Sequence, residues 1–176
     1  ENLPLVLEFE TRGNDSIGKC IYLIEETGNG FGFFAEFHIM LQKLIFAECF
    51  HLKPYVYWGK NFLYYEKDII NTQNAYEYLF EAINGDLKNK IDTADLLTKS
   101  KMGQAEWVVN RYERGFDLSP KYLAKAADVY KRYIHLKPEI SSKIQYDITE
   151  LLGRKRTLAV HYRGTDFKMN YDNHPV

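Results

Sequence analysis

The fold is decided by the stretch Lys19-Cys20-Ile21-Tyr22-Leu23-Ile24-Glu25 and by the loop that follows it, Thr27-Gly28-Asn29-Gly30-Phe31-Gly32-Phe33-Phe34. The first run is short, apolar and bounded by turn residues, which predicts a buried β-strand. In the second run three glycines stand at alternate positions. Because glycine adopts turn conformations at little steric cost, this run predicts a tight loop that allows close approach.

A helix and a second strand are expected after the loop. From Phe33 to about His51 the apolar residues recur at helical spacing, and Glu36 lies near the amino end, where its charge suits the helix dipole. The pattern ends at His51-Leu52-Lys53-Pro54, where a cation precedes a proline. The next run, Pro54-Tyr55-Val56-Tyr57-Trp58-Gly59, predicts a strand. Together these elements predict a βαβ unit with a parallel strand pair and a right-handed crossover.

The middle of the chain is predicted to be mostly helical. The segment from Asn74 to Ile83 is rich in aromatic residues and ends at Asn84-Gly85, a pair typical of a helix end. Between Asp86 and Asp117 the periodicity is poor, and we expect short helices and irregular connections there.

Two later helices have clear start signals. Ser119-Pro120 supplies a capping serine and a proline at the first helical position, and the helix is expected to run to about Leu136. Pro138 opens a further helix that ends at Gly153. The short apolar run Thr157-Leu158-Ala159-Val160 follows and predicts another strand.

Composition narrows the class of protein. The chain has 176 residues, of which 45% are hydrophobic and 27% charged, as in an ordinary globular domain. A net charge of −1 gives no electrostatic footprint for nucleic acid, and no run approaches the about 20 apolar residues of a membrane span. We expect a cytoplasmic enzyme, or a protein of the Golgi or ER lumen if the N-terminus, which begins with Glu, was trimmed.

Cysteines and aromatic residues give weaker indications. Cys20 and Cys49 lie in no metal-ligand spacing, so no zinc site or disulfide framework is indicated, and both are expected to be buried thiols. Aromatic residues make up 15% of the chain. Aromatic rings suit sugar-binding clefts, but they also fill cores, and the core interpretation is favoured.

The last motif of the chain is His161-Tyr162-Arg163-Gly164-Thr165-Asp166. A strand that ends in an arginine next to glycine fixes the backbone and allows close approach. The planar guanidinium can then bind two phosphate oxygens at once. The motif therefore indicates phosphate binding by Arg163.

These two regions together resemble the fucosyltransferase superfamily. Residues 158–166 are similar to its His-x-Arg-x-x-Asp signature, and residues 28–32 are similar to the Gly-x-Gly-Phe-Gly loop of core-type members. The group includes Nod-factor, core α1,6- and protein O-fucosyltransferases. The order and separation of the two motifs also fit, although little can be aligned between Asp86 and Asp117.

The resemblance implies an α/β protein of GT-B fold, in which two Rossmann-like domains face each other across a cleft. Residues 1–152 would be the N-terminal, acceptor-side domain with a helical insertion, and residues 153–176 the start of a truncated GDP-sugar-binding domain. The expected activity is inverting, metal-independent transfer of fucose from GDP-fucose to a glycan or peptide acceptor, without a cofactor. The chain alone is expected to be inactive. In a second possibility, the strand at residues 157–160 adds to the edge of the first sheet.

The resemblance also implies roles for single residues. Arg163 would grip the diphosphate as the catalytic residue, His161 would donate a hydrogen bond to the nucleotide, and Asp166 would orient the arginine or its loop. The glycine-rich loop would wall the sugar end of the cleft through Gly30, Phe31 and Gly32.

One departure and one gap remain. Core-type members carry a second arginine where this chain has Gly164, but protein O-fucosyltransferases lack it too, so the subfamily and the sugar stay open. No catalytic base is identified. Glu36 and His38 lie near the loop, but Glu36 is more simply interpreted as part of the helix start and His38 as a residue with ordinary packing partners.

Two other functions are compatible with these patterns. The aromatic content suits a non-catalytic module that binds a glycan or a peptide. The loop could also serve a dinucleotide, but its glycine spacing lacks the third, more distant glycine of the usual fingerprint.

Overall fold

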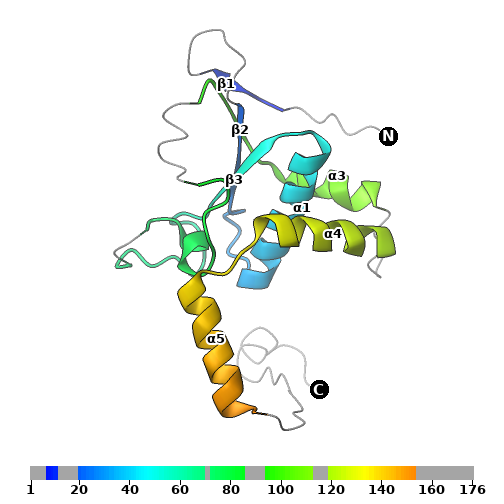
Figure 1. The fold of residues 1–176 in the computed structure, drawn as a ribbon. Helices are drawn as coiled ribbons and strands as arrows, with labels where there is room; N and C mark the ends of the chain where they lie inside the picture. Colours follow the sequence, from blue (N-terminus) through cyan, green and yellow to red (C-terminus); the bar gives the residue numbers. More distant parts are fainter. Residues whose placement is uncertain (1–6, 12–19, 70–71, 86–93, 113–118, 154–176) are drawn as a thin grey trace, which may run out of the picture. The chain divides into compact units, whose positions relative to one another are not determined.

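The computed structural model describes residues 7–11, 20–69, 72–85, 94–112 and 119–153. The chain divides into two compact units, Glu1–Lys137 and Pro138–Val176, which are described separately. The described part of the first unit is an α/β fold built on a mixed four-stranded sheet (Figure 1). The boundary expected between residues 152 and 153 from the resemblance stays an expectation.

The sheet has the strand order β1-β4-β2-β3. Its strands are β1 (Glu10–Thr11), β2 (Cys20–Glu25), β3 (Lys53–Tyr57) and β4 (Leu96–Lys99). Strand β2 pairs in parallel with both β3 and β4, and β1 pairs antiparallel with β4. Leu23 in β2 lies opposite Tyr55 in β3 and Lys99 in β4. The predicted parallel pair at residues 19–25 and 54–59 is therefore confirmed, with β2 as a central strand.

Helix α1 (Phe33–Cys49) connects β2 to β3 and packs against both strands, as predicted. Its other neighbours are α3 (Met102–Arg111) and α4 (Pro120–Tyr133), which lie beside it in Figure 1. The helix ends two residues before His51, which has a positive φ of 54°, and β3 then begins at Lys53. The left-handed residue turns the chain back toward the sheet.

Side chains alternate between the two faces of the sheet along each strand, and both faces carry buried residues. Tyr22, Ile24 and Val56 belong to the larger core, which includes residues of α1, α3 and α4. On the opposite face Ile21, Leu23 and Tyr55 form a smaller cluster with Ala94 and Leu97. The core interpretation of the aromatic residues is confirmed for the largest fully buried ones, which are Trp58, Tyr22, Tyr55, Tyr76, Tyr122 and Phe46.

The prediction of a helix from Asn74 to Ile83 is wrong. Only one turn of 3₁₀-helix, η1 (Ala75–Tyr78), forms there. Phe80 then makes an antiparallel bridge with Leu136, and Lys137 N–H donates to the Leu79 carbonyl. These long-range hydrogen bonds take backbone groups that a longer helix would use, so tertiary pairing overrides the local pattern.

The expectation for residues 86–117 missed a strand. Strand β4 has only four residues, too few for a clear alternating pattern, and it is followed directly by α3. The Gln104 side-chain oxygen joins α3 to the sheet, because it accepts hydrogen bonds from the Lys101 N–H and from the Tyr22 hydroxyl, at 2.9 and 2.6 Å.

The two later helices are confirmed. Ser119 caps α4, with its hydroxyl oxygen accepting from the Tyr122 N–H at 3.2 Å. Helix α5 (Pro138–Leu151) lies in the second unit and is followed by Gly153 with φ 54°. The strand expected at residues 157–160 lies outside the described residues. Cys20 and Cys49 are only partly buried, contrary to expectation.

Candidate functional site

The candidate site lies at the carboxyl edge of the parallel strands. The chain leaves β2 through α1 to reach β3 on one side, whereas β4 lies on the other side of β2. In open α/β sheets, ligands bind outside the carboxyl ends of the strands at the point where the connections diverge in this way. The segment that follows β2, Glu26 to Gly32, occupies that position.

The ends of the three parallel strands are tied to one another by side chains. The Glu25 carboxylate pairs with the Lys99 ammonium at 3.1 Å, at the end of β4. The Glu26 carboxylate accepts a hydrogen bond from the Gly59 N–H at 2.9 Å, just after β3. The Glu25 N–H donates to the Ser100 hydroxyl at 3.4 Å. These contacts connect the carboxyl ends of β2, β3 and β4 next to the loop.

The glycine-rich loop begins in a left-handed backbone conformation. Gly28 and Gly30 have φ values of 71° and 66°, which are strained for residues with a Cβ. A Cβ added at either position would meet no atom of the described residues within 4 Å. These two glycines are therefore required by backbone conformation, and the space beside them is open. Gly30, Phe31 and Gly32, predicted as site residues, lie together on this loop.

The loop leads directly into the amino end of α1. Gly32 is the N-cap residue, in an extended conformation and without a capping side chain, and its carbonyl accepts from Ala35 N–H at 3.0 Å and Glu36 N–H at 3.2 Å. The amino end of a helix carries a partial positive charge and free N–H groups. This end of α1 can therefore donate hydrogen bonds to an anionic group that approaches the loop.

Glu36 is buried, with 3% of its surface exposed, and its carboxylate reaches back across the loop. One oxygen accepts a hydrogen bond from the Thr27 N–H at 3.0 Å, and the other accepts from the Thr27 hydroxyl. The Thr27 hydroxyl oxygen in turn accepts from the Asn29 N–H at 3.3 Å. The carboxylate is therefore engaged in holding the loop, in agreement with its interpretation as part of the helix start.

Lys43 is a second buried charged residue on α1, and the sequence patterns did not single it out. Its ammonium donates to the Glu25 carbonyl at 3.2 Å, at the end of β2. Burial lowers the pKa of Lys43, and the charges of Glu36, Glu25 and Glu26 act in the opposite direction. A lysine within an otherwise apolar helix face was the available signal, because such a residue needs a partner inside the protein.

His38 points to a different neighbour. Its Nε2 lies 2.8 Å from the Tyr122 hydroxyl, and the two rings are in edge contact, which links α1 to α4. This contact agrees with the interpretation of His38 as a residue with ordinary packing partners.

Exposed aromatic rings surround the loop. Phe34 at the start of α1 is 83% exposed, and Tyr64, in the turn after β3, is 52% exposed. A Cβ on Gly32 would lie 3.9 Å from the Tyr64 hydroxyl, so the turn at Tyr64 lies against the loop. Phe31 and Leu63 are exposed as well. We call the three aromatic residues, Phe31, Phe34 and Tyr64, the aromatic patch.

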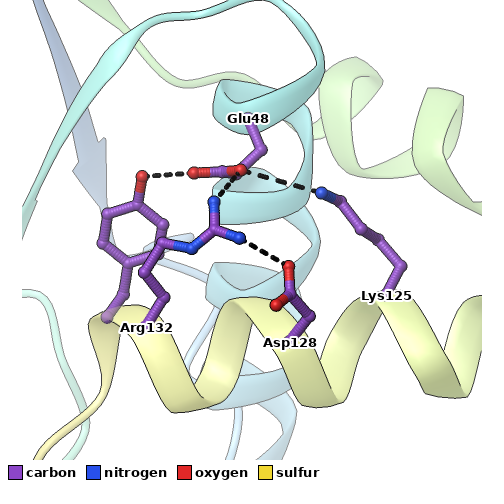
Figure 2. Close-up of polar contacts among 5 residues, drawn as sticks. Glu48, Lys125, Asp128 and Arg132 are labelled. Carbon is purple, nitrogen blue, oxygen red and sulfur yellow. Dashed lines mark hydrogen bonds and ion pairs between the residues drawn. The ribbon is translucent and has the colours of Figure 1, made fainter.

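A second polar cluster lies at the opposite end of α1. Figure 2 shows Glu48 of α1 with Lys125, Asp128 and Arg132 of α4. The Glu48 carboxylate pairs with Arg132 and lies 3.7 Å from the Lys125 ammonium, and it accepts a hydrogen bond from the Tyr133 hydroxyl. Burial alone would raise the pKa of Glu48, but the bonds from Tyr133 and Arg132 and the charges of Arg132 and Lys125 lower it. This cluster fastens α4 to α1.

The predicted donor-binding residues His161, Arg163 and Asp166 lie outside the described residues. Within the described ranges, no group of three or more His, Cys, Asp and Glu side chains could hold a metal ion. Among the helices of the described ranges, none is long and apolar enough to cross a membrane.

Comparison of the sequence with protein-family models found no match, and searches of curated proteins and of solved structures found none either.

Proposed function

We propose that this chain belongs to an inverting, metal-independent glycosyltransferase of GT-B fold that transfers fucose from GDP-fucose to a glycan or peptide acceptor. The observation that carries the proposal is the position of the Gly28–Gly32 loop, at the carboxyl end of a central parallel strand and at the amino end of α1. Residues 1–152 would belong to the Rossmann-like, acceptor-side domain, and residues 153–176 to the start of the GDP-sugar-binding domain. The resemblance of residues 158–166 to the fucosyltransferase signature supplies the specific donor.

The proposed reaction is a single displacement. The acceptor oxygen forms a bond to C1 of fucose, the bond from C1 to the β-phosphate oxygen breaks, and GDP leaves with the electron pair. The acceptor proton passes to a base. Negative charge grows on the β-phosphate as the bond breaks, and the fixed guanidinium of Arg163 would stabilise it. His161 would bind the nucleotide and Asp166 would orient Arg163.

The described residues support a place for the donor sugar and its phosphates. The loop leaves open space beside Gly28 and Gly30, and the uncapped amino end of α1 offers N–H groups to an anion. The strand ends beneath the loop are held by Glu25 and Glu26. A site of this kind is preorganised, which lowers the free energy needed to order it around a ligand.

Calorimetric titration with GDP and GDP-fucose tests the proposal, with protein expressed from its complete reading frame. We expect the wild-type protein to bind both, and Arg163→Ala to lower the transfer rate by about 10²-fold, the usual cost of losing one such donor. Arg154→Ala, outside the signature, is the matched control and should leave binding and rate unchanged. Absence of GDP and GDP-fucose binding, together with no effect of Arg163→Ala, would reject the proposal.

The aromatic patch favours a second candidate, a non-catalytic module that binds a glycan or a peptide. Exposed rings next to polar groups can stack on the apolar face of a sugar. A glycan array with this chain separates the two functions. Glycan binding that needs no nucleotide, and that is lost in Phe34→Ala, would favour the module, whereas nucleotide binding lost with Arg163 favours the transferase.

A further inference from the structure

Three hydrogen bonds close the base of the glycine-rich loop. The Glu36 carboxylate accepts from the N–H and from the hydroxyl of Thr27, and the hydroxyl oxygen accepts from the Asn29 N–H. The Thr27 hydroxyl therefore donates once and accepts once, so this one group joins the helix to the loop. We call Glu36 and Thr27 the loop clamp.

The clamp differs from an ordinary helix cap. In a capping box, the glutamate at the third helical position bonds to the N–H of the capping residue next to its own turn. Glu36 is instead the fourth residue of α1, and its carboxylate does not bond to the N-cap residue, Gly32. It accepts from Thr27, nine positions back in the chain. The first turn of α1 is thereby fixed to the end of β2, and the loop between them is closed at both ends.

Glu36 and Lys43 are buried residues of opposite charge on the same helix. Among the charged groups that act on Lys43, Glu36 has the largest effect. Both residues are only 3% exposed, and Lys43 also donates to the Glu25 carbonyl at the end of β2. The charge of Glu36 therefore acts on a buried lysine that is itself bonded to the end of the central strand.

A loop with glycines at 28 and 30 has many conformations unless contacts restrict it. Ordering each residue costs conformational entropy, and a ligand that must order the loop loses that part of its binding free energy. A clamp that orders the loop beforehand removes this cost. Loss of the clamp should therefore lower the affinity for a ligand held by the loop, while the rest of the fold stays intact.

We propose that Glu36 and Thr27 are positioning residues, which hold the Gly28–Gly32 loop in the conformation that binds the sugar and phosphates of the nucleotide-sugar donor. For the identity of the ligand, this inference rests on the proposed function. Glu36 acts through Thr27 and is not the catalytic base.

Thr27→Val tests the clamp, because valine keeps the shape of threonine and removes only the hydroxyl. Amide hydrogen exchange reports on the order of the loop, and calorimetry with GDP-fucose reports on binding. We expect Thr27→Val to speed exchange at residues 28–32 by about tenfold, the ratio given by one ordinary hydrogen bond, and to weaken GDP-fucose binding by a similar factor. Exchange in the middle of β2 and α1 should not change.

Two controls isolate the hydroxyl. Thr27→Ser keeps it and should restore both loop order and binding. Thr98→Val makes the same chemical change at a buried threonine of β4 whose hydroxyl has no hydrogen-bond partner among the described residues, so it should alter neither.

Unchanged loop exchange in Thr27→Val would overturn the clamp. Faster exchange with unchanged GDP-fucose affinity would overturn its role in donor binding. If the wild-type protein binds neither GDP nor GDP-fucose, the proposed function fails, and with it the donor part of this inference. Faster loop exchange in Thr27→Val would in that case still support the clamp.

Discussion

The two ends of α1 each carry a glutamate, and the two are held in different ways. Glu36, in the first turn, is buried and accepts from the uncharged donors of Thr27. Glu48, in the last turn, has a 16% exposed side chain and lies among the cations of α4, Arg132 and Lys125 (Figure 2). The first glutamate orders a loop, and the second attaches a helix.

The two glutamates allow the stabilisation by a buried, hydrogen-bonded carboxylate to be compared with that by a partly exposed ion pair. Salt screens interactions between exposed charges, and the arginine that pairs with Glu48 is itself half exposed. Exposed pairs of this kind contribute little to stability. A buried carboxylate that accepts two hydrogen bonds is hardly screened, and removing it leaves the partly buried donors of Thr27 without this acceptor. The two ends of one helix should therefore respond differently to mutation, pH and salt.

The largest effect is expected from removing the carboxylate at the loop end. Glu36→Ala leaves the Thr27 N–H and hydroxyl without their acceptor and removes the counter-charge of Lys43. We expect the free energy of unfolding, measured by urea denaturation, to fall by about 3 kcal/mol. Glu48→Ala, at the other end of the same helix, should cost less than half as much. Equal losses would show that the two ends are held alike.

A double-mutant cycle sharpens the account of the loop end. Lys43→Met removes the buried ammonium but keeps most of the side-chain volume, and Glu36→Gln removes the carboxylate charge that acts on it most strongly. Each single variant should lower the free energy of unfolding, and the double variant should lose less than the sum by about 1 kcal/mol. Strict additivity would mean that the two charges do not act on each other.

A pH titration distinguishes the other end. The pKa of Glu48 is lowered in the folded protein, so its stabilisation is present above the ordinary glutamate pKa of about 4.3 and is lost as the pH falls through the lower folded value. At neutral pH, Glu48→Gln should lower the melting temperature by about 2 °C. The difference from wild type should shrink below about pH 3.5 and also in 1 M salt. A difference that persists under both conditions would contradict the ion-pair account.

The stabilisation by the Glu48 cluster is also expected to decrease at alkaline pH, through Tyr133. Burial, followed by the hydrogen bond to Glu48 and its charge, raises the pKa of Tyr133 to about 12. A group with a raised folded pKa stabilises the protein below its unfolded value, here about 10, and loses that contribution as the pH rises toward the folded value. Burial also raises the pKa of Tyr22 and of Tyr76, so Tyr133→Phe should reduce, and not abolish, the fall in melting temperature that wild type shows above about pH 10. A fall as large in this variant as in wild type would mean that Tyr133 contributes nothing to it.

The sequence predicted the elements with strong local signals. The apolar run of β2, the helical periodicity of α1 and the Ser119-Pro120 start of α4 each correspond to an observed element. It failed where distant partners decide the structure. Asn74 is one example: its side chain accepts from the Trp58 N–H and donates to the Val56 carbonyl, both at 2.8 Å, so it extends the hydrogen bonding of β3 from outside the sheet.

The candidate site was predicted in part for the same reason. The left-handed glycines 28 and 30 could be anticipated, because alternate glycines indicate a tight loop. The contacts of Thr27 and Lys43 could not, since a lysine on the apolar face of α1 indicates that it needs a partner but not which one, and both residues gain their partners only when α1 packs against β2. Lys99 was missed together with the short strand that carries it.

The last comparison is between two glycines of one loop. Gly30 has φ 66° and open space around it, whereas Gly32 has an ordinary φ of −64° and only the Tyr64 hydroxyl nearby. Gly30→Ala should therefore cost about 1 kcal/mol in free energy of unfolding through backbone strain alone. Gly32→Ala should cost almost nothing. Urea denaturation of both variants decides the matter, because a larger loss at Gly32 would mean that the loop needs glycine for close approach in the free protein and not for its backbone conformation.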